Sequence, residues 1–304
     1  MAPDRARAAG SPHSETWFSQ PWTLFLGLRA GEVRRYSHTV DHWLLVYVAI
    51  GAFIGFFAGM LGMGGGGIQV PLTTMAFAAQ GFPRDHMLHV ALGTAMATVI
   101  FTSLSSLRAH HRHGAVNWSV LRRLLPGIVI GTGLGTLVAR HIPTFPLAVI
   151  FVVFVLYMAS SMLFNWKPKP TRQLPPPPGL FVAGTVIGVC SALAAMGGAT
   201  LTIPFLVFCN VPFHTAIGTA SAVGFPIAVV GSLGYLINGW GAEGLPAQSV
   251  GYIYVPALIG FTVGSMVLAP FGARLAHRTS ERSLKRIFAI VIGALGLKML
   301  VALA

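Results

Sequence analysis

The chain has 304 residues, of which 54% are hydrophobic and only 9% are charged. A soluble globular domain carries about 25% charged residues, so the composition excludes a soluble protein and predicts an all-α protein that crosses a membrane several times. The net charge of +13 does not indicate nucleic-acid binding, because the basic residues gather in short polar gaps between apolar runs. The seven acidic residues lie outside the middle of those runs, which leaves no buried carboxylate to hold a cation or relay a proton.

The N-terminal part, residues 1–42, is polar and contains one short apolar patch, residues 22–28. The patch is too short to span a bilayer, and no small-residue cleavage site follows it, so we expect an interfacial arm rather than a signal peptide. We expect three parts after this arm: a first membrane repeat over residues 43–165, a proline-rich basic linker over residues 166–178, and a second membrane repeat over residues 179–304.

The two membrane parts are predicted to be a repeat, because the same two motifs occur in both and in the same order. Aligning GMGGGGIQVP with AMGGATLTIP pairs Pro71 with Pro204. Aligning HVALGTA with HTAIGTA pairs His89 with His214. Each repeat is expected to hold five apolar segments, at about 44–63, 66–80, 88–107, 119–139 and 145–164 in the first and about 180–197, 199–211, 214–237, 251–272 and 284–303 in the second.

The second segment of each repeat is short and interrupted by Gly and Pro. At about 1.5 Å per residue it cannot cross about 30 Å of hydrocarbon, so we expect a half-helix, a tilted helix or a re-entrant helix. The three strongest clusters of basic residues all lie on the same side of the membrane if each repeat crosses it an odd number of times, and an odd number of crossings makes the repeats inverted. These clusters are Arg108, Arg112, Arg122 and Arg123; Lys167, Lys169 and Arg172; and Arg274, Arg278, Arg282, Lys285 and Arg286. Four crossings per half would make the repeats parallel, and this alternative stays open.

The glycine-rich breaks before the short segments are the candidate binding sites. In lipid, irregular backbone persists only where protein buries it or where it lines a watery cavity. The helix that starts after each break offers unpaired N–H groups and a positive dipole end, which suit an anion. A single glycine is better explained by close helix packing, but two such breaks at matching positions favour a site. The backbone candidates are Gly64, Gly65, Gly66, Gly67, Gly197, Gly198 and Thr200.

Side chains near the breaks complete the candidate site. Gln69 and Thr202 are equivalent in the repeat and could donate to an anion or to a neighbouring helix. Thr94 and Thr219 follow Gly in both copies and could complete the site or bond back to the preceding turn. His89 and His214, at equivalent helix starts, could donate to an anion or carry a proton, although polar residues at a helix start need no such role.

These residues resemble the TauE/SafE family of sulfite exporters. The resemblance is carried by GMGGGGIQVP with HVALGTA and by the copies AMGGATLTIP and HTAIGTA, and it covers the chain from about Phe53 to the C-terminus. Members of this family move small anions, chiefly sulfite, sulfonates such as sulfoacetate and some organic acids, across bacterial inner membranes. The resemblance therefore implies a small sulfur-containing or carboxylate anion as substrate. Ala199 and Thr200 stand where the first copy has Gly66 and Gly67, so the two breaks are not expected to contribute equally.

We therefore expect a multi-pass secondary transporter of the bacterial inner membrane, working as an exporter of small anions by alternating access. Export suits an anion, since each negative charge that leaves an inside-negative cell gains about 2.3 kcal/mol per 100 mV. The sequence has no P-loop, G-x-S-x-G or H-E-x-x-H motif, so no enzymatic activity, catalytic residue, metal or cofactor is expected. The expected partners are the anion and the lipid bilayer, with a homodimer left open. A carboxylate transporter, or an assembly factor or enzyme without transport, are the alternatives.

Overall fold

The computed structural model describes residues 30–61, 65–164, 171–276 and 281–303. Residues 44–304 form one compact unit and residues 1–43 another. In the described part, seven helices are long and apolar enough to cross a membrane, which confirms an all-α polytopic membrane protein. The apolar patch at residues 22–28, the backbone candidate Gly64 and the linker residues 165–170 lie outside the described residues.

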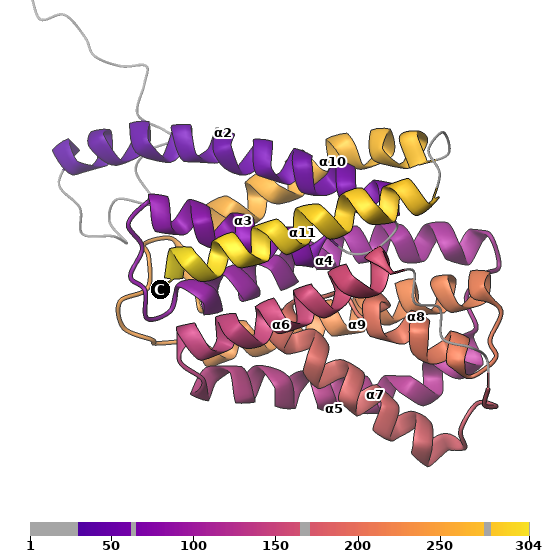
Figure 1. Ribbon diagram of the computed structural model, residues 1–304. Helices are drawn as coiled ribbons and strands as arrows, with labels where there is room; N and C mark the ends of the chain where they lie inside the picture. The colour runs from indigo at the N-terminus through magenta and orange to yellow at the C-terminus, as the bar shows by residue number, and fades with distance from the viewer. Residues whose placement is uncertain (1–29, 62–64, 165–170, 277–280, 304) are drawn as a thin grey trace, which may run out of the picture. The chain divides into compact units, whose positions relative to one another are not determined.

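Ten helices match the ten expected segments (Figure 1). Those before the linker are α2 (Ala30–Leu61), α3 (Gly66–Ala79), α4 (Met87–Arg112), α5 (Trp118–His141) and α6 (Thr144–Leu163). Those after it are α7 (Pro177–Ala194), α8 (Ala199–Phe208), α9 (Phe213–Asn238), α10 (Val255–Ala276) and α11 (Glu281–Leu303). The helix α2 begins within the residues expected to form the polar arm, and a hairpin of β1 (Ser249–Val250) and β2 (Ile253–Tyr254) occupies the start of the expected segment 251–272.

The two short helices turn back toward the face from which they came. The helix α3 has 14 residues and runs antiparallel to α2, because Gly65 at its start lies beside Ile54 while Gln80 at its end is hydrogen-bonded to the Tyr47 hydroxyl. The helix α8 has 10 residues, and the carbonyl of its last residue, Phe208, accepts N–H groups from the chain just before α7. Each α2–α3 and α7–α8 pair is therefore a re-entrant hairpin rather than two full crossings.

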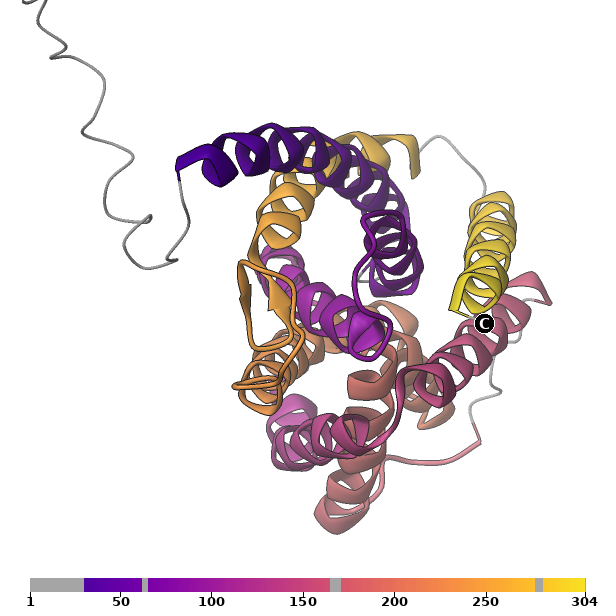
Figure 2. The ribbon, with the colours of Figure 1, turned by 90° about the vertical axis from the view of Figure 1, so that its left-hand side faces the viewer.

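This path defines two faces, which we name the basic face and the hairpin face. The basic face carries the end of α4 and the starts of α5, α7, α9 and α11, and the described residues of all three basic clusters lie there. The hairpin face, toward the viewer in Figure 2, carries β1 and β2, the start of α4 and the end of α5. Contacts across each face fix this assignment: Asn117 reaches Thr219 on the basic face, and Thr144 reaches Asp85 on the hairpin face.

Glycines allow two pairs of helices to pack with their backbones in contact. Along α2, a Cβ added at Gly55 would lie 2.4 Å from the carbonyl oxygen of Ser265 on α10. Along α7, a Cβ added at Gly188 would lie 2.6 Å from the carbonyl oxygen of Ile128 on α5. Only a residue without a side chain permits this approach, as at other small-residue interfaces between membrane helices.

An aromatic cluster closes the hairpin face over α2, α3 and α10. The Tyr47 ring lies with its centroid 6.3 Å from that of Phe77, 6.0 Å from that of Tyr254 and 5.3 Å from that of Phe261. Phe82 stacks on Phe77 at 4.7 Å. These rings contact one another edge to face or stacked, so this end of the unit is packed rather than hollow.

Candidate functional site

The two glycine breaks meet inside the protein. A Cβ added at Gly66, in the first turn of α3, would lie 2.0 Å from the carbonyl oxygen of Ala195, which ends α7 just before the second break. Ala195 has φ of 46° and Gly198 has φ of 73°, so the chain between α7 and α8 uses two left-handed residues to turn back on itself. The first break is buried: Gly65, Gly66 and Gly67 pack against Ile54 and the chain after α7, and none of them lines the cavity at the second break.

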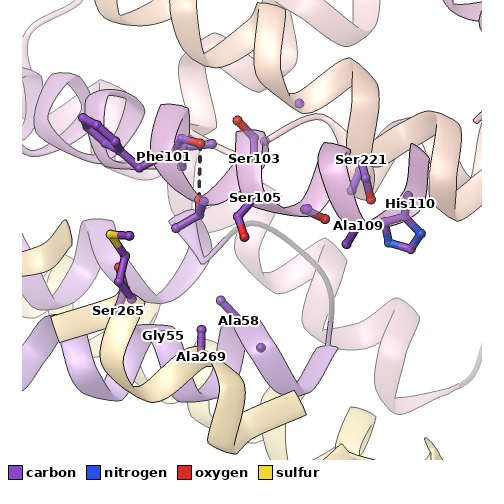
Figure 3. A pocket seen from close by; sticks show the side chains of 18 of the residues that line it. Gly55, Ala58, Phe101, Ser103, Ser105, Ala109, His110, Ser221, Ser265 and Ala269 are labelled. Atoms are coloured by element: carbon purple, nitrogen blue, oxygen red, sulfur yellow. Dashed lines mark hydrogen bonds between the residues drawn. The ribbon is translucent and has the colours of Figure 1, made fainter. Parts of the chain in front are cut away.

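The second break opens into a cavity of about 480 Å³. Its walls come from α2, α4, α9 and α10, and Gly197 and Ala199 line it at the start of α8. Figure 3 shows Ser105 of α4 and Ala58 of α2 on facing walls, with His110 toward the end of α4. Because His110 belongs to the last turn of α4, the cavity lies in the half of the unit that is nearer the basic face.

Hydroxyl groups are the main polar lining of this cavity, and none of the described residues that line it is acidic. Ser103, Thr102 and Ser265 bond weakly back to their own helices, with oxygen-to-oxygen distances of 3.1–3.2 Å. Ser221 and Ser105 have no hydrogen-bond partner in the part of the chain that the structure describes. A neutral cavity rich in hydroxyl donors accepts a solute whose surface is made of acceptor oxygens and does not repel negative charge.

The N-terminus of α8 adds backbone donors at the inner end of the cavity. The N–H groups of Ala199 and Thr202 bond to the carbonyls of Gly197 and Gly198 at 2.9 and 3.0 Å. The N–H groups of Thr200 and Leu201 have no acceptor within the described residues, as expected for the first turn of a helix. Ser103 lies near this helix end, since a Cβ added at Gly224 would be 2.6 Å from the Gly197 oxygen and 3.7 Å from the Ser103 Cβ.

Other predicted side chains hold helices together. The Gln69 amide donates to the Thr98 hydroxyl at 2.9 Å, which joins α3 to α4. The Thr94 hydroxyl accepts the N–H of Tyr254 at 2.9 Å, and the Thr219 hydroxyl accepts the N–H of Asn117 at 3.0 Å. Thr202 is buried with its hydroxyl unpartnered within the described residues, and it does not line the cavity.

The two predicted histidines have different surroundings. His89 is 3% exposed; its Nε2 donates to the Ala139 carbonyl at 2.9 Å, and its Nδ1 is buried without a partner in the described part. Its ring lies 5.2 Å from that of Tyr252, on the hairpin that follows α9. Burial raises the pKa of the Tyr252 phenol, an effect opposed by the charge of Arg140. His214 is exposed at the basic face. Neither histidine lines the cavity.

The sequence pointed to Ser221 beside Thr219, but the hydroxyls that α4 and α10 contribute to the cavity were missed. Four of them lie in the run Thr102–Ser103–Leu104–Ser105–Ser106 of the membrane helix α4. Four hydroxyl residues in five positions of a membrane helix are a signal, since one or two are enough for interhelical hydrogen bonds. Of the predicted substrate-binding residues that the structure describes, only Gly197 lines the cavity.

Comparisons with known proteins identify the family. The profile of the sulfite exporter TauE/SafE family matches residues 47–299. The chain belongs to this family. A Haemophilus influenzae protein named "Probable membrane transporter protein" is 30% identical over 259 residues, covering 84% of this chain and 98% of its own length. Proteins with the same designation from Methanocaldococcus jannaschii and Bacillus subtilis (YdhB) are each 25% identical, covering 84% of this chain and 95% and 98% of their own lengths. No solved structure matches the chain.

As a TauE/SafE protein whose described residues include seven helices long and apolar enough to span a membrane, the chain is a multi-pass membrane transporter of the inner membrane and not an enzyme. The relatives match almost over their whole lengths, so the similarity includes both halves of the membrane part rather than one motif. Within the described residues, no group of three or more His, Cys, Asp or Glu side chains could hold a metal ion.

Proposed function

We propose that this protein is a secondary transporter that exports small oxyanions, sulfite or organosulfonates such as sulfoacetate, through the hydroxyl-lined cavity at the start of α8. The observation that carries the proposal is the cavity of about 480 Å³, which meets a helix N-terminus and has no acidic lining residue. An anion with three oxygen atoms can accept hydrogen bonds from several directions at once, and here hydrogen-bond donors come from α4, α8, α9 and α10.

We further propose that the two halves form an inverted repeat. Two mirrored contacts support this arrangement. Thr94 and Thr219, which are equivalent in the repeat, each accept the N–H of the residue directly before a helix of the other half, α10 and α5. Gly93 and Gly218 likewise face the carbonyl oxygens of Tyr252 and Ala115. Each half makes three full crossings and one re-entrant hairpin, so the second half runs in the opposite sense to the first.

The basic face is proposed to lie in the cytoplasm, because loops rich in Lys and Arg stay on that side. The cavity, which lies in the half nearer that face, then represents a state open to the cell interior. Alternating access moves such a site to the other side by rocking one repeat against the other. The membrane potential drives the exit of an anion by this route.

Purified protein in liposomes tests the proposal. It should carry sulfite or sulfoacetate, and Ser221→Ala should raise the KM for sulfite several-fold with an unchanged melting temperature, because the Ser221 hydroxyl has no partner to lose among the described residues. Ser232→Ala is the matched control: Ser232 is buried on the same helix but bonds to its own backbone outside the cavity, so KM should stay the same.

The alternatives give different results in the same assay. A carboxylate transporter would carry small organic acids in preference to sulfite, and the same hydroxyls would then bind two oxygens instead of three. A membrane assembly factor or an enzyme would carry no small anion at all, and that outcome would refute the proposal.

A further inference from the structure

The cavity occupies only one of the two places that the proposed repeat relates to each other. It lies between α2, α4, α9 and α10, near the basic face. The corresponding place lies between α7, α9, α4 and α5, nearer the hairpin face, and the following contacts show that it is closed. This inference rests on the proposed function, since it concerns the path of the same anions.

The residues that correspond can be assigned helix by helix. The alignment of GMGGGGIQVP with AMGGATLTIP, extended toward the N-terminus without a gap, relates the residues of α2 to those of α7. The alignment of HVALGTA with HTAIGTA relates the residues of α4 to those of α9. The contacts relate α5 to α10 by pairing Asn117 with Tyr254, because these two residues donate to the equivalent threonines of α9 and α4. The glycine packing gives the same correspondence. Gly55 of α2 and its equivalent in α7, Gly188, face the backbone oxygens of Ser265 and Ile128. Pairing Asn117 with Tyr254 and counting along α5 and α10 also makes Ile128 equivalent to Ser265.

A hydrogen bond closes the corresponding place at its outer end. The Tyr235 hydroxyl on α9 donates to the Ala192 carbonyl on α7 at 3.0 Å, and the Tyr235 side chain is 1% exposed. Their counterparts in the other half are His110 and Gly59, and both of these line the open cavity. The same pair of positions is therefore joined in one half and separated by a cavity in the other.

A second contact shows the same difference. The Met96 side chain of α4 fills the space beside Gly231 of α9, with its sulfur 3.0 Å from where a Cβ of Gly231 would lie. The counterparts of Gly231 and Met96 are Ser106 and Ser221, which both line the open cavity.

Two hydroxyls in the closed place are buried without a partner. Ser191 of α7 is 2% exposed and Thr132 of α5 is 0% exposed, and neither hydroxyl has a hydrogen-bond partner within the described residues. Their counterparts, Ala58 and Ala269, line the open cavity. A buried hydroxyl without a partner is unfavourable, so both groups would gain hydrogen bonds if water or a solute entered.

We propose that α4, α5, α7 and α9 enclose a second cavity for the same small oxyanions, which opens to the hairpin face when the first cavity closes. Ser191 and Thr132 are its hydroxyl ligands, and the Tyr235–Ala192 hydrogen bond is its closing contact. The substrate is thus handed from one set of hydroxyls, on Ser103 and Ser221, to another set that is buried in the present state. This second set determines which anions can leave on the hairpin face.

Cysteine accessibility tests the second cavity. In a background with Cys190→Ala and Cys209→Ala, a membrane-impermeant maleimide added at the hairpin face should label Ser191→Cys and Thr132→Cys slowly. Adding Tyr235→Phe removes the closing hydrogen bond and should accelerate this labelling several-fold. The matched control is Ala58→Cys, which lines the open cavity: it should be labelled from the basic face, and more slowly once Tyr235→Phe is present.

A double variant keeps the test independent of labelling chemistry. Met96→Cys with Gly231→Cys should form a disulfide that holds the second cavity closed, so that oxidation stops anion flux and a reductant restores it. Flux that continues through the fully oxidised variant would overturn the inference, as would an absence of labelling at both Ser191→Cys and Thr132→Cys in protein that transports anions. Absence of flux in the unmodified protein would instead refute the proposed function.

Discussion

At the residue scale, the paired threonines of the repeated GTA motif have a structural role that their sequence context does not reveal. Thr94 and Thr219 are 0% exposed, and each accepts a backbone N–H from the other half of the chain. The sequence suggested a bond to the preceding turn or to a substrate, because the real donors, Tyr254 and Asn117, lie far away along the chain. Only the folded arrangement of the two halves brings these partners together.

We therefore predict that Thr219→Ala destabilises the protein. The substitution leaves the partly buried Asn117 N–H without its acceptor, which costs about 0.5–1.5 kcal/mol. Thermal unfolding in detergent should show a melting temperature several degrees lower, whereas Thr219→Ser, which keeps the oxygen, should stay close to the parent. Equal melting temperatures for the Ala and Ser variants would show that the bond contributes nothing.

The hydroxyls of the cavity differ from these threonines in what they can bind. Thr219 has a backbone partner, but Ser221, two residues later on α9, has none in the described part of the chain. A side chain without an internal partner can donate to a solute without first breaking a bond. The two residues thus separate stability from transport, and their variants should affect different measurements.

At the element scale, the apolar runs predicted each of the ten helices in the described part of the chain, and the glycine and proline breaks predicted which two are short. Helix α3 begins within its glycine run, at Gly66, and α8 begins directly after Gly198, at Ala199, because the chain must turn sharply before each of them. The β1–β2 hairpin was not predicted, since its residues Tyr252–Tyr254 are apolar and continue without a break into α10. The cavity was not predicted either, because its walls belong to four helices that are distant in sequence.

The contact between the two breaks gives a second prediction. Gly66→Ala places a methyl group only 2.0 Å from the Ala195 carbonyl oxygen, which is a severe steric clash. The clashing atom belongs to the backbone, which cannot move aside as a flexible side chain can. We expect a loss of about 1–3 kcal/mol of stability or a large fall in the yield of folded protein. Thermal unfolding and size-exclusion profiles measure both quantities.

The neighbouring glycine is the control for that variant. A Cβ at Gly67 would have as its nearest neighbour the terminal methyl of Met196 at 3.9 Å, an ordinary contact. Because alanine also favours the helix by up to about 1 kcal/mol relative to glycine, Gly67→Ala should be as stable as the parent or more so. If both variants lost stability equally, the close approach of the two breaks would not be the cause.

At the scale of the whole molecule, charge is distributed unevenly between the two faces. The described basic residues of the three clusters, among them Arg112, Arg172 and Arg274, lie on one face. Among the described residues of the 44–304 unit, the opposite face carries Arg84 and Arg140 together with Asp85 and Glu243, and Lys298 lies near the end of α11 on that side, so this face is less basic than the other. The cavity lies nearer the strongly positive face, where the field raises the local concentration of anions. Substrate capture and membrane orientation thus depend on the same asymmetry.

This asymmetry predicts how the chain lies in the membrane. With Cys190→Ala and Cys209→Ala as background, Ala247→Cys on the hairpin face and Ser119→Cys on the basic face are both exposed positions in or beside loops. In intact cells an impermeant maleimide should label Ala247→Cys and leave Ser119→Cys unlabelled until the membrane is broken, because the positive face stays in the cytoplasm. Labelling in the reverse order would place the basic face and the cavity nearer the outside of the cell. The structure would then represent an outward-open state, and it would support import as well as export.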